Sequence, residues 1–167
     1  MAFRIEPLGK HHDRAAFASG APLLDDWFRE RATQDDKRNV ARIFVAVHDK
    51  DIAGFYSLSA FTLSFTDIPE DLARKLPRYD AIPAGLIGRL ARAERVRGQG
   101  IGALLLADAI KRVLGAGRTL AVFVIVVDAT DNRAVTFYKR YGFRSFPSRP
   151  RRLFLLASTA AAGLTKL

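Results

Sequence analysis

A glycine-rich segment, Arg97-Gly98-Gln99-Gly100-Ile101-Gly102, has residue types and spacing that could bind a phosphate. It lies between an apolar segment that predicts a strand and an amphipathic segment that predicts a helix over 98–114. The first N–H groups of a helix have no partner within the helix and carry partial positive charge, so they can hold a phosphate or pyrophosphate. Glycine lets the anion approach the backbone because it has no side chain. The segment therefore predicts a site for a phosphorylated cofactor.

A tyrosine in a second predicted helix, over 132–141, is a candidate for proton transfer. Tyr138 lies in this helix, which begins at Asn132. A phenol with a pKa of about 10 is protonated at neutral pH and can donate a proton to a departing group. Phe137, Tyr138 and Tyr141 also lie at helical spacing, which is typical of rings packed in a core. On the residues alone, both interpretations stay open.

The chain is strongly basic, and its cations are grouped. Lys and Arg outnumber Asp and Glu, which gives a formal net charge of +10. Arginine suits phosphate recognition because its planar guanidinium can donate two parallel hydrogen bonds. The grouping favours a polyanionic partner such as a nucleic acid over a merely solvated surface. Arg89 fits two roles equally well, contact with a substrate and pairing with a buried carboxylate. The grouped cations are Arg89, Arg92, Arg95 and Arg97, then Lys139, Arg140, Arg144, Arg149, Arg151 and Arg152, with a third, smaller group at Arg74, Lys75 and Arg78.

Other features of the composition exclude several kinds of site. The chain has no cysteine, so it has no disulfide framework, no thiol nucleophile and no cysteine metal site. Its three histidines, at positions 11, 12 and 48, are too few and too scattered to suggest a metal centre, and we expect none. No apolar run is long enough to span a membrane, and the N-terminus lacks the apolar stretch of a secretory signal. We therefore expect a cytoplasmic protein that does not bind membranes.

The elements that position these residues alternate between strands and helices. The pattern predicts a single α/β domain over 1–167, with a central mixed β-sheet flanked by helices. The segment 120–127 is apolar on both faces, which indicates a strand covered from both sides. We assign no role to the tail 157–167. The predicted strands are 3–8, 41–48, 52–61, 85–92, 120–127, 143–146 and 153–156. The predicted helices are 21–34, 98–114 and 132–141, with a short helix possible at 70–76 inside a long loop over 64–83.

Two strings, in this order and separation, resemble the signatures of the GCN5-related N-acetyltransferase (GNAT) family. Arg97-x-x-Gly100-x-Gly102 resembles the family's acetyl-CoA pyrophosphate loop, and 131–143 resembles its second signature. The resemblance extends over about residues 5–156 to the toxin branch of toxin–antitoxin systems. It is carried there by 17–28 (Phe-Ala-Ser-Gly followed by Leu-Asp-Asp-Trp-Phe), by 54–59 and by 83–91. The chain departs from the branch at Arg92 and Ala93, where an apolar residue and often an Asp are usual.

The resemblance implies the GNAT fold, acetyl-CoA as the cofactor and an amine as the acetyl acceptor. In that family reading, the backbone of Leu90, Ala91 and Arg92 binds the pantetheine arm, and Asn132 lies near it. Tyr138 donates a proton to the departing thiolate. The pyrophosphate is held by Arg97, Gly98, Gln99, Gly100, Ile101 and Gly102. The branch implies acetylation of the amino acid on an aminoacyl-tRNA, which blocks translation. It also implies a ribbon-helix-helix antitoxin and a homodimer. The residues expected to face substrate or tRNA are Arg89, Arg149, Arg151 and Arg152.

Two alternatives remain beside this reading. The same fold could acetylate a protein N-terminus, a lysine or a small-molecule amine, or the chain could be a non-enzymatic nucleic-acid-binding protein. An α-amino group titrates near 7.7 to 8.0, against about 10.4 for lysine, so a useful fraction is neutral at pH 7 without a strong base. This favours an aminoacyl group, because the sequence shows no obvious histidine or carboxylate constellation for a base.

Overall fold

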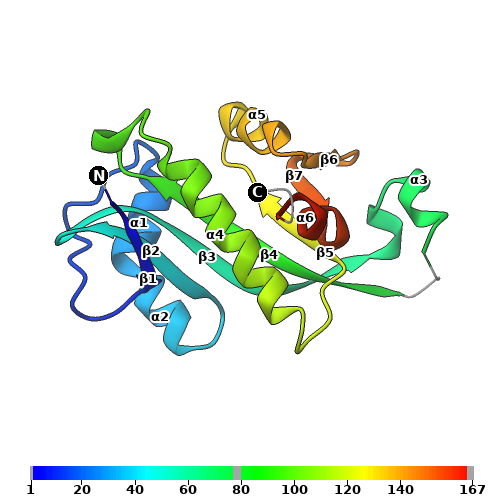
Figure 1. The fold of residues 1–167 in the computed structure, drawn as a ribbon, viewed down its shortest axis with the longest axis horizontal. Coiled ribbons are helices and arrows are strands. Elements are labelled where there is room, and N and C mark those ends of the chain that lie inside the picture. Colours follow the sequence, from blue (N-terminus) through cyan, green and yellow to red (C-terminus); the bar gives the residue numbers. More distant parts are fainter. Residues whose placement is uncertain (1, 77–79, 165–167) are drawn as a thin grey trace. The chain divides into compact units, whose positions relative to one another are not determined.

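The computed structural model describes residues 2–76 and 80–164, which form two compact units. The first unit comprises 1–59 and 88–111, and the second comprises 60–87 and 112–167. The single domain over 1–167 stays a prediction. The strands follow the order β1-β2-β3-β4-β5-β7-β6, with β4 and β5 parallel (Figure 1). They are β1 (Arg4–Pro7), β2 (Arg42–His48), β3 (Asp51–Ser64), β4 (Ala81–Arg92), β5 (Val124–Asp128), β6 (Arg144–Phe146) and β7 (Arg149–Leu156). The helices are α1 (Pro22–Glu30), α2 (Ala32–Lys37), α3 (Glu70–Ala73), α4 (Ile101–Ala116), α5 (Asn132–Arg140) and α6 (Ala157–Leu164).

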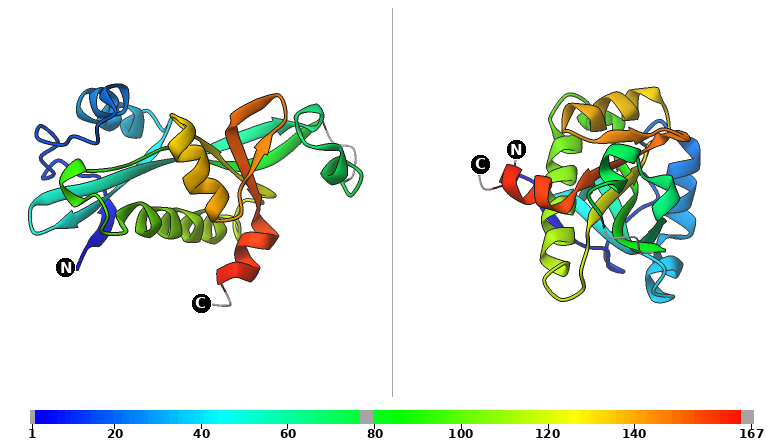
Figure 2. Two further views of the ribbon diagram at one scale, coloured as in Figure 1. Left: turned by 90° about the horizontal axis from the view of Figure 1, so that it is seen from above. Right: turned by 90° about the vertical axis from the view of Figure 1, so that its right-hand side faces the viewer.

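The first unit has helices on both faces of its strands, because successive residues of β3 point to opposite sides. The Phe55 ring stacks on Phe28 of α1, with ring centroids 4.1 Å apart. On the other face, a side chain at Gly54 would lie 2.8 Å from Leu105 of α4, so glycine is what lets this helix approach. Figure 2 shows α1 and α4 on opposite sides of the strands. The alternation of β3 thus places Phe55 against α1 and Gly54 against the first turns of α4.

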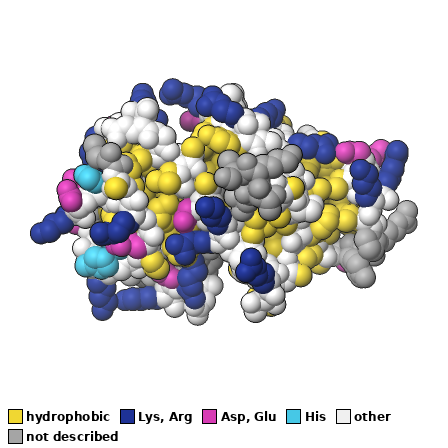
Figure 3. Space-filling model, viewed as in Figure 1, with side chains coloured by type: hydrophobic (Ala, Val, Ile, Leu, Met, Phe, Trp, Pro, Cys, Tyr) yellow, Lys and Arg dark blue, Asp and Glu magenta, His cyan; other side chains and the backbone are white. Residues whose placement is uncertain are grey.

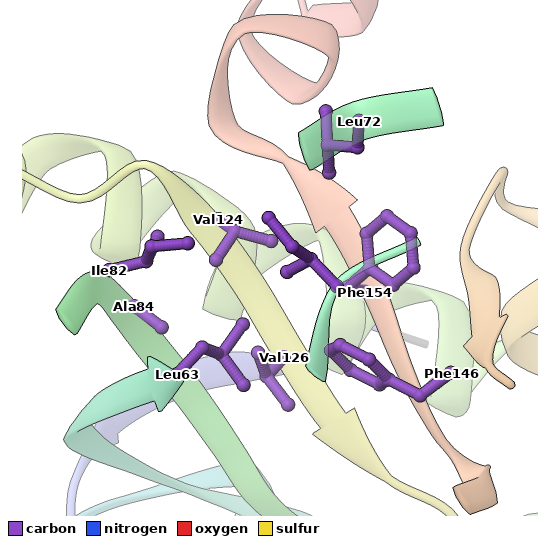
Figure 4. Packing of buried hydrophobic residues seen from close by; sticks show 9 residues of the cluster. Leu63, Leu72, Ile82, Ala84, Val124, Val126, Phe146 and Phe154 are labelled. Carbon is purple, nitrogen blue, oxygen red and sulfur yellow. The ribbon is translucent and has the colours of Figure 1, made fainter. Parts of the chain in front are cut away.

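The second unit is built on a buried hydrophobic cluster that includes β5. Val124 and Val126 of this strand belong to the cluster, together with Phe146 and Phe154, whose ring centroids lie 4.9 Å apart (Figure 4). All four residues from Val124 to Val127 are buried, which confirms the expected strand that is covered from both sides. The buried β5 strand leads directly into the turn and helix that follow it.

Several predicted elements differ from the structure. Two strands begin earlier than predicted, β4 at Ala81 instead of 85 and β7 at Arg149 instead of 153. The predicted helix 21–34 is two helices, because the chain leaves helical geometry at Arg31, where φ is −121°. The predicted strand 120–127 begins only at Val124, since Leu120 is exposed and the Phe123 N–H donates to the carbonyl of Pro83. The loop over 64–83 contains a 3₁₀ turn at 65–67 and α3, and its residues 77–79 lie outside the described residues. The tail forms α6 as far as residue 164.

Candidate active site

The glycine-rich loop leads directly into α4 and adopts the backbone that its sequence predicts. Gly98 and Gly100 have φ values of +81° and +77°, a region that residues with a Cβ rarely adopt. A Cβ at either position would meet no heavy atom within 4 Å. The space in front of the loop is therefore open, and the need for glycine comes from the backbone conformation rather than from crowding.

The loop offers four backbone N–H groups to an anion. Within the described part of the chain, the N–H groups of Gly98, Gly100, Ile101 and Gly102 have no hydrogen-bond acceptor, and the first helical bond runs from Leu104 to the Gly100 carbonyl. The Gln99 N–H instead donates to the Val96 carbonyl over 3.2 Å. The sequence predicts that Gln99 holds a phosphate together with its neighbours, but its backbone N–H is bonded within the turn. The four free donors of this loop, which leads into the 16-residue helix α4, make an anion cradle at the helix N-terminus.

The other residues expected at the cofactor lie at the end of β4 and just after it. The pairing of β4 with β5 covers Ala84–Ile87, so Leu90, Ala91 and Arg92 lie beyond this register. Ala91 is buried and Arg92 is half-buried. Arg97 is exposed beside the cradle, and its own N–H donates to the Glu94 carbonyl. Arg97 can therefore extend its guanidinium toward an anion held by the loop.

Tyr138 and Asn132 lie on α5 in the second unit. The Asp131 carboxylate caps this helix by accepting the Ala134 N–H over 2.8 Å, so Asn132 is its first residue and is exposed. Tyr138 is only 3% exposed, and its ring contacts Phe137 and Phe143. Its hydroxyl makes no hydrogen bond with any residue that the structure describes. Both interpretations of Tyr138 thus find support, since the ring packs while the hydroxyl stays available.

The electrostatic surroundings keep the Tyr138 hydroxyl protonated. Desolvation by burial, with a smaller effect of the Asp128 negative charge, raises the pKa of Tyr138 well above its ordinary value. The phenol is therefore protonated near neutral pH and can serve as a proton or hydrogen-bond donor. Sequence reasoning missed Asp128, although a carboxylate at the end of a buried strand, just before the second signature, was a signal that could have found it.

Arg152 is held by that carboxylate. Its Nε and Nη2 donate to the two oxygens of Asp128 over 2.8 and 3.1 Å, and its guanidinium lies 4.8 Å from the centre of the Phe61 ring. The hydrogen bonds to Asp128 raise the pKa of Arg152 further above its ordinary value. The Arg152 side chain is 17% exposed. It is therefore much less available to tRNA than the sequence pattern suggested.

Arg149 and Arg151, the other two arginines of β7 expected to face tRNA, are exposed. Arg151 donates to the Thr130 carbonyl over 3.4 Å. On the face of the molecule in Figure 3, Lys and Arg side chains occur at many separate places, with hydrophobic side chains between them. Part of the sequence clustering is also neutralised, because Arg144 pairs with Asp71 over 3.2 Å.

Arg89 stacks on an aromatic ring of the first unit. Its guanidinium carbon lies 4.0 Å from the centre of the Trp27 ring, and Trp27 donates its indole N–H to Asp35 over 2.9 Å. Trp27 is itself buried in the core of the first unit. The Arg89 N–H donates to the Ser57 hydroxyl, which fixes the strand beneath the stack. Arg89 is thus a positioned, half-buried cation on an aromatic support.

The N-terminal motif of the toxin branch builds the loop that precedes α1. The buried Asp25 carboxylate accepts hydrogen bonds from the Ser19 N–H, at 3.0 and 3.1 Å, and from its hydroxyl, at 2.7 Å. Gly20 has a φ of +93°, and a side chain there would lie 2.6 Å from the Glu94 carboxylate. The Glu94 N–H donates to the Ala18 carbonyl. The motif therefore anchors α1 to the segment before the cradle, and Glu94 is an exposed side chain.

Two histidines near the N-terminus converge, which the sequence pattern did not predict. Glu6 Oε1 lies 2.7 Å from His12 Nε2 and 3.5 Å from His11 Nε2, beside a hollow of about 810 Å³ in the first unit. The Gly9 N–H donates to His12 Nδ1, so the ring proton of neutral His12 is on Nε2, where it is donated to Glu6. This bond is the main cause of the lowered pKa of Glu6. Glu6, His11 and His12 thus form a hydrogen-bonded and charge-paired cluster in the first unit.

No helix among the described residues is both long and apolar enough to cross a membrane.

The chain matches the family model described as an acetyltransferase (GNAT) domain over residues 39–145. It is 34% identical to a probable toxin TacT of Sinorhizobium fredii over 165 residues, which cover 93% of this chain and 91% of the relative. It is 35% identical to a tRNA-acetylating toxin of Mycobacterium tuberculosis over 150 residues, which cover 90% and 89%.

Two solved structures share the fold. One is AtaT complexed with acetyl-methionyl-tRNAfMet, with a TM-score of 0.88 and 24% identity, covering 99% of this chain and 100% of that chain. The other is a mutant AtaT toxin bound to the C-terminus of the antitoxin AtaR and acetyl-CoA, with a TM-score of 0.85, 23% identity and 99% of both chains covered. The expected fold and the expected similarity to toxins of the family are thus confirmed. The chain belongs to the GNAT family of acetyltransferases.

Proposed function

We propose that this protein is a toxin that transfers an acetyl group from acetyl-CoA to the α-amino group of an amino acid carried on tRNA. The observation that carries the proposal is the cradle of four free N–H groups at the start of α4, in a chain of the GNAT family. A pyrophosphate is the anion that such a cradle suits, and acetyl-CoA contains one. The two relatives named as toxins cover about nine tenths of this chain and support the acceptor.

Each part of the site has a distinct task in this reaction. Acetyl-CoA is a substrate that supplies an activated acetyl thioester. Gly98, Gly100, Ile101 and Gly102 hold its pyrophosphate, and Arg97 adds positive charge. The end of β4 offers backbone groups to the pantetheine arm, with Asn132 expected near that arm. When the neutral amine attacks the carbonyl carbon, a carbon–nitrogen bond forms, the carbon–sulfur bond breaks, and the Tyr138 hydroxyl donates its proton to the leaving thiolate. The proton that the amine loses passes to water, and Tyr138 regains a proton from water, so the step yields an amide and the free thiol of CoA.

The acceptor amine needs little help from the protein. A free α-amino group titrates near 7.7 to 8.0, and the ester bond to tRNA withdraws electrons and lowers that pKa further. A useful fraction is therefore neutral and nucleophilic at pH 7. Arg89, stacked on Trp27, is the cation we expect nearest the acceptor, and the exposed Arg149 and Arg151 are expected to contact tRNA phosphates. Acetylation removes the nucleophile that peptide-bond formation requires, so translation stops.

The partners follow from the same proposal. AtaT in its solved structures binds an acetylated aminoacyl-tRNA or an antitoxin segment. We infer that an antitoxin with a ribbon-helix-helix domain inhibits this chain, that it acts as a homodimer, and that it acts in the cytoplasm. A protein N-terminus, a lysine or a small-molecule amine is the alternative acceptor, and the high pKa of lysine makes it a poorer nucleophile at pH 7 than an α-amino group.

The deciding experiment uses labelled acetyl-CoA with total charged tRNA and with the same tRNA after deacylation. We expect label only on the charged pool, and we expect mild base to release it together with the amino acid, which identifies that amino acid. Label on deacylated tRNA, or on neither pool while acetyl-CoA binds, would contradict the proposed acceptor. Acetyl transfer to any amine would still exclude a purely nucleic-acid-binding role.

A further inference from the structure

The segment between β5 and α5 is fastened to β7 at three successive residues. Asp128 pairs with Arg152 through two side-chain hydrogen bonds, and the two residues lie opposite each other in the β5–β7 register. The Ala129 N–H donates to the Arg151 carbonyl over 2.8 Å. The Thr130 carbonyl accepts from the Arg151 guanidinium. The very next residue caps α5, so this fastening sets where the helix begins.

The other end of α5 is also fixed. The Phe143 N–H donates to the Tyr138 carbonyl over 3.3 Å, and the rings of these two residues lie 5.7 Å apart. Tyr138 therefore has its backbone and ring held from the C-terminal side, while the start of its helix is held through Asp128 and Arg152. A shift of the Asp128–Arg152 pair would move the Tyr138 hydroxyl along the helix direction.

Charge leads to the same conclusion as geometry. Asp128 places a negative charge close enough to act on the phenol of Tyr138, and Arg152 donates to that carboxylate from Nε and Nη2. Because the positive charge of Arg152 offsets that of Asp128, it limits how far Asp128 raises the pKa of Tyr138. Nε and Nη2 are bonded to Asp128, one face of the guanidinium lies over the Phe61 ring, and the side chain is only 17% exposed, so little of Arg152 is accessible to a tRNA phosphate.

We propose that Arg152 is a positioning residue, which clamps Asp128 so that α5 holds Tyr138 at the thioester, and that it is not a tRNA ligand. This assigns a different task to one of the three β7 arginines expected to contact tRNA. The proposal rests on the proposed function, because it takes Tyr138 as the proton donor. The proposal gives Arg152 a different role from Arg149 and Arg151. All three lie on β7, but Arg149 and Arg151 are exposed, whereas Arg152 is half-buried.

The test compares R152Q with R149Q and with R118Q, which removes an exposed arginine outside the site. We expect R152Q to lower kcat about tenfold because the reacting groups shift. The affinity for deacylated tRNA and its dependence on salt should stay as in the natural protein. R149Q should instead reduce the slope of log affinity against log salt by about 0.9, the value for one phosphate contact. R118Q should change neither quantity.

A double-mutant cycle shows whether Arg152 acts through Tyr138. In a Y138F background, R152Q should cost less than about twofold in kcat, because the group it positions is gone. A conservative variant, R152K, keeps the charge and the fold but cannot make the paired hydrogen bonds, so its kcat should also fall. If R152Q does not fold, R152K in both backgrounds carries the test.

Several outcomes would overturn the inference. One is an R152Q protein with full kcat and a salt slope reduced as in R149Q, and another is an equal loss of kcat in the Y138F background. Full activity of Y138F would overturn it together with the role of Tyr138. Failure of the natural protein to acetylate charged tRNA would instead contradict the proposed function, so the two failures are separable.

Discussion

At the scale of single residues, the hydroxyl of Tyr138 is the group whose removal tests the chemistry most directly. Phenylalanine at this position keeps a ring against Phe137 and Phe143 and removes the proton donor. We expect Y138F to lower kcat about 100-fold and to change the Kd for acetyl-CoA less than about twofold, since the cradle is untouched. Steady-state kinetics and calorimetry measure the two quantities. An unchanged kcat would show that Tyr138 only packs.

Burial of the same hydroxyl has a consequence for stability at high pH. Because desolvation raises the pKa of Tyr138, the folded chain keeps this proton above about pH 10, while the unfolded chain loses it. The folded state then binds more protons, so the free energy of unfolding falls as the pH rises, by about 1.4 kcal/mol per pH unit from this group. The natural protein should therefore lose stability between about pH 10 and pH 11.5 more steeply than Y138F.

Urea denaturation at a series of pH values measures this difference. Y141F is the matched control, because it removes the phenol of a neighbouring residue that is 42% exposed. The same alkaline slope in the natural protein and in Y138F would mean that the Tyr138 hydroxyl reaches water in the folded state.

At the scale of elements, the two ends of α4 use glycine in different ways. Gly100 lies before the helix with a φ of +77°, whereas Gly115 lies inside its last turn, and a Cβ at either would meet open space. A residue with a Cβ pays about 1 to 2 kcal/mol in left-handed geometry, so G100A should let the loop relax and turn its N–H groups away from the anion. We expect acetyl-CoA affinity to fall about tenfold in G100A.

G115A is the control for this prediction. It should leave acetyl-CoA affinity unchanged and raise the free energy of unfolding by up to about 1 kcal/mol, since alanine favours a helix interior more than glycine does. Calorimetry and thermal unfolding measure both effects. Normal acetyl-CoA binding by G100A would show that the positive φ is dispensable and that the cradle lies elsewhere.

Elements whose signals are local could be predicted from the sequence. The start of α4 follows from its glycines, and α5 follows from its ring spacing and its polar start. What could not be predicted depends on partners far along the chain. The pairing of Arg152 with Asp128 spans 24 residues and needs the β5–β7 register. The sequence also predicted a free backbone N–H at Gln99, because its turn hydrogen bond to the Val96 carbonyl has no signature in residue types.

At the scale of the whole molecule, the net charge of +10 predicts that phosphate contacts supply most of the tRNA affinity. Charged and deacylated tRNA should then bind about equally, although only the charged form is acetylated. The exposed Arg149 and Arg151 are the cations of β7 best placed for such contacts. Replacing both with glutamine should reduce the slope of log affinity against log salt by about 2, because each contact releases close to one counterion.

A variant with the same loss of charge distinguishes contact from the general field. K111Q/R118Q also removes two exposed cations, but neither belongs to the proposed site. If phosphates contact Arg149 and Arg151, only R149Q/R151Q lowers the slope, whereas a general attraction would affect both double variants alike. Filter binding between about 50 and 200 mM salt covers the range in which such slopes are measured. Equal slopes for the two double variants would place the tRNA-binding surface away from β7 and leave its charge as a long-range attraction.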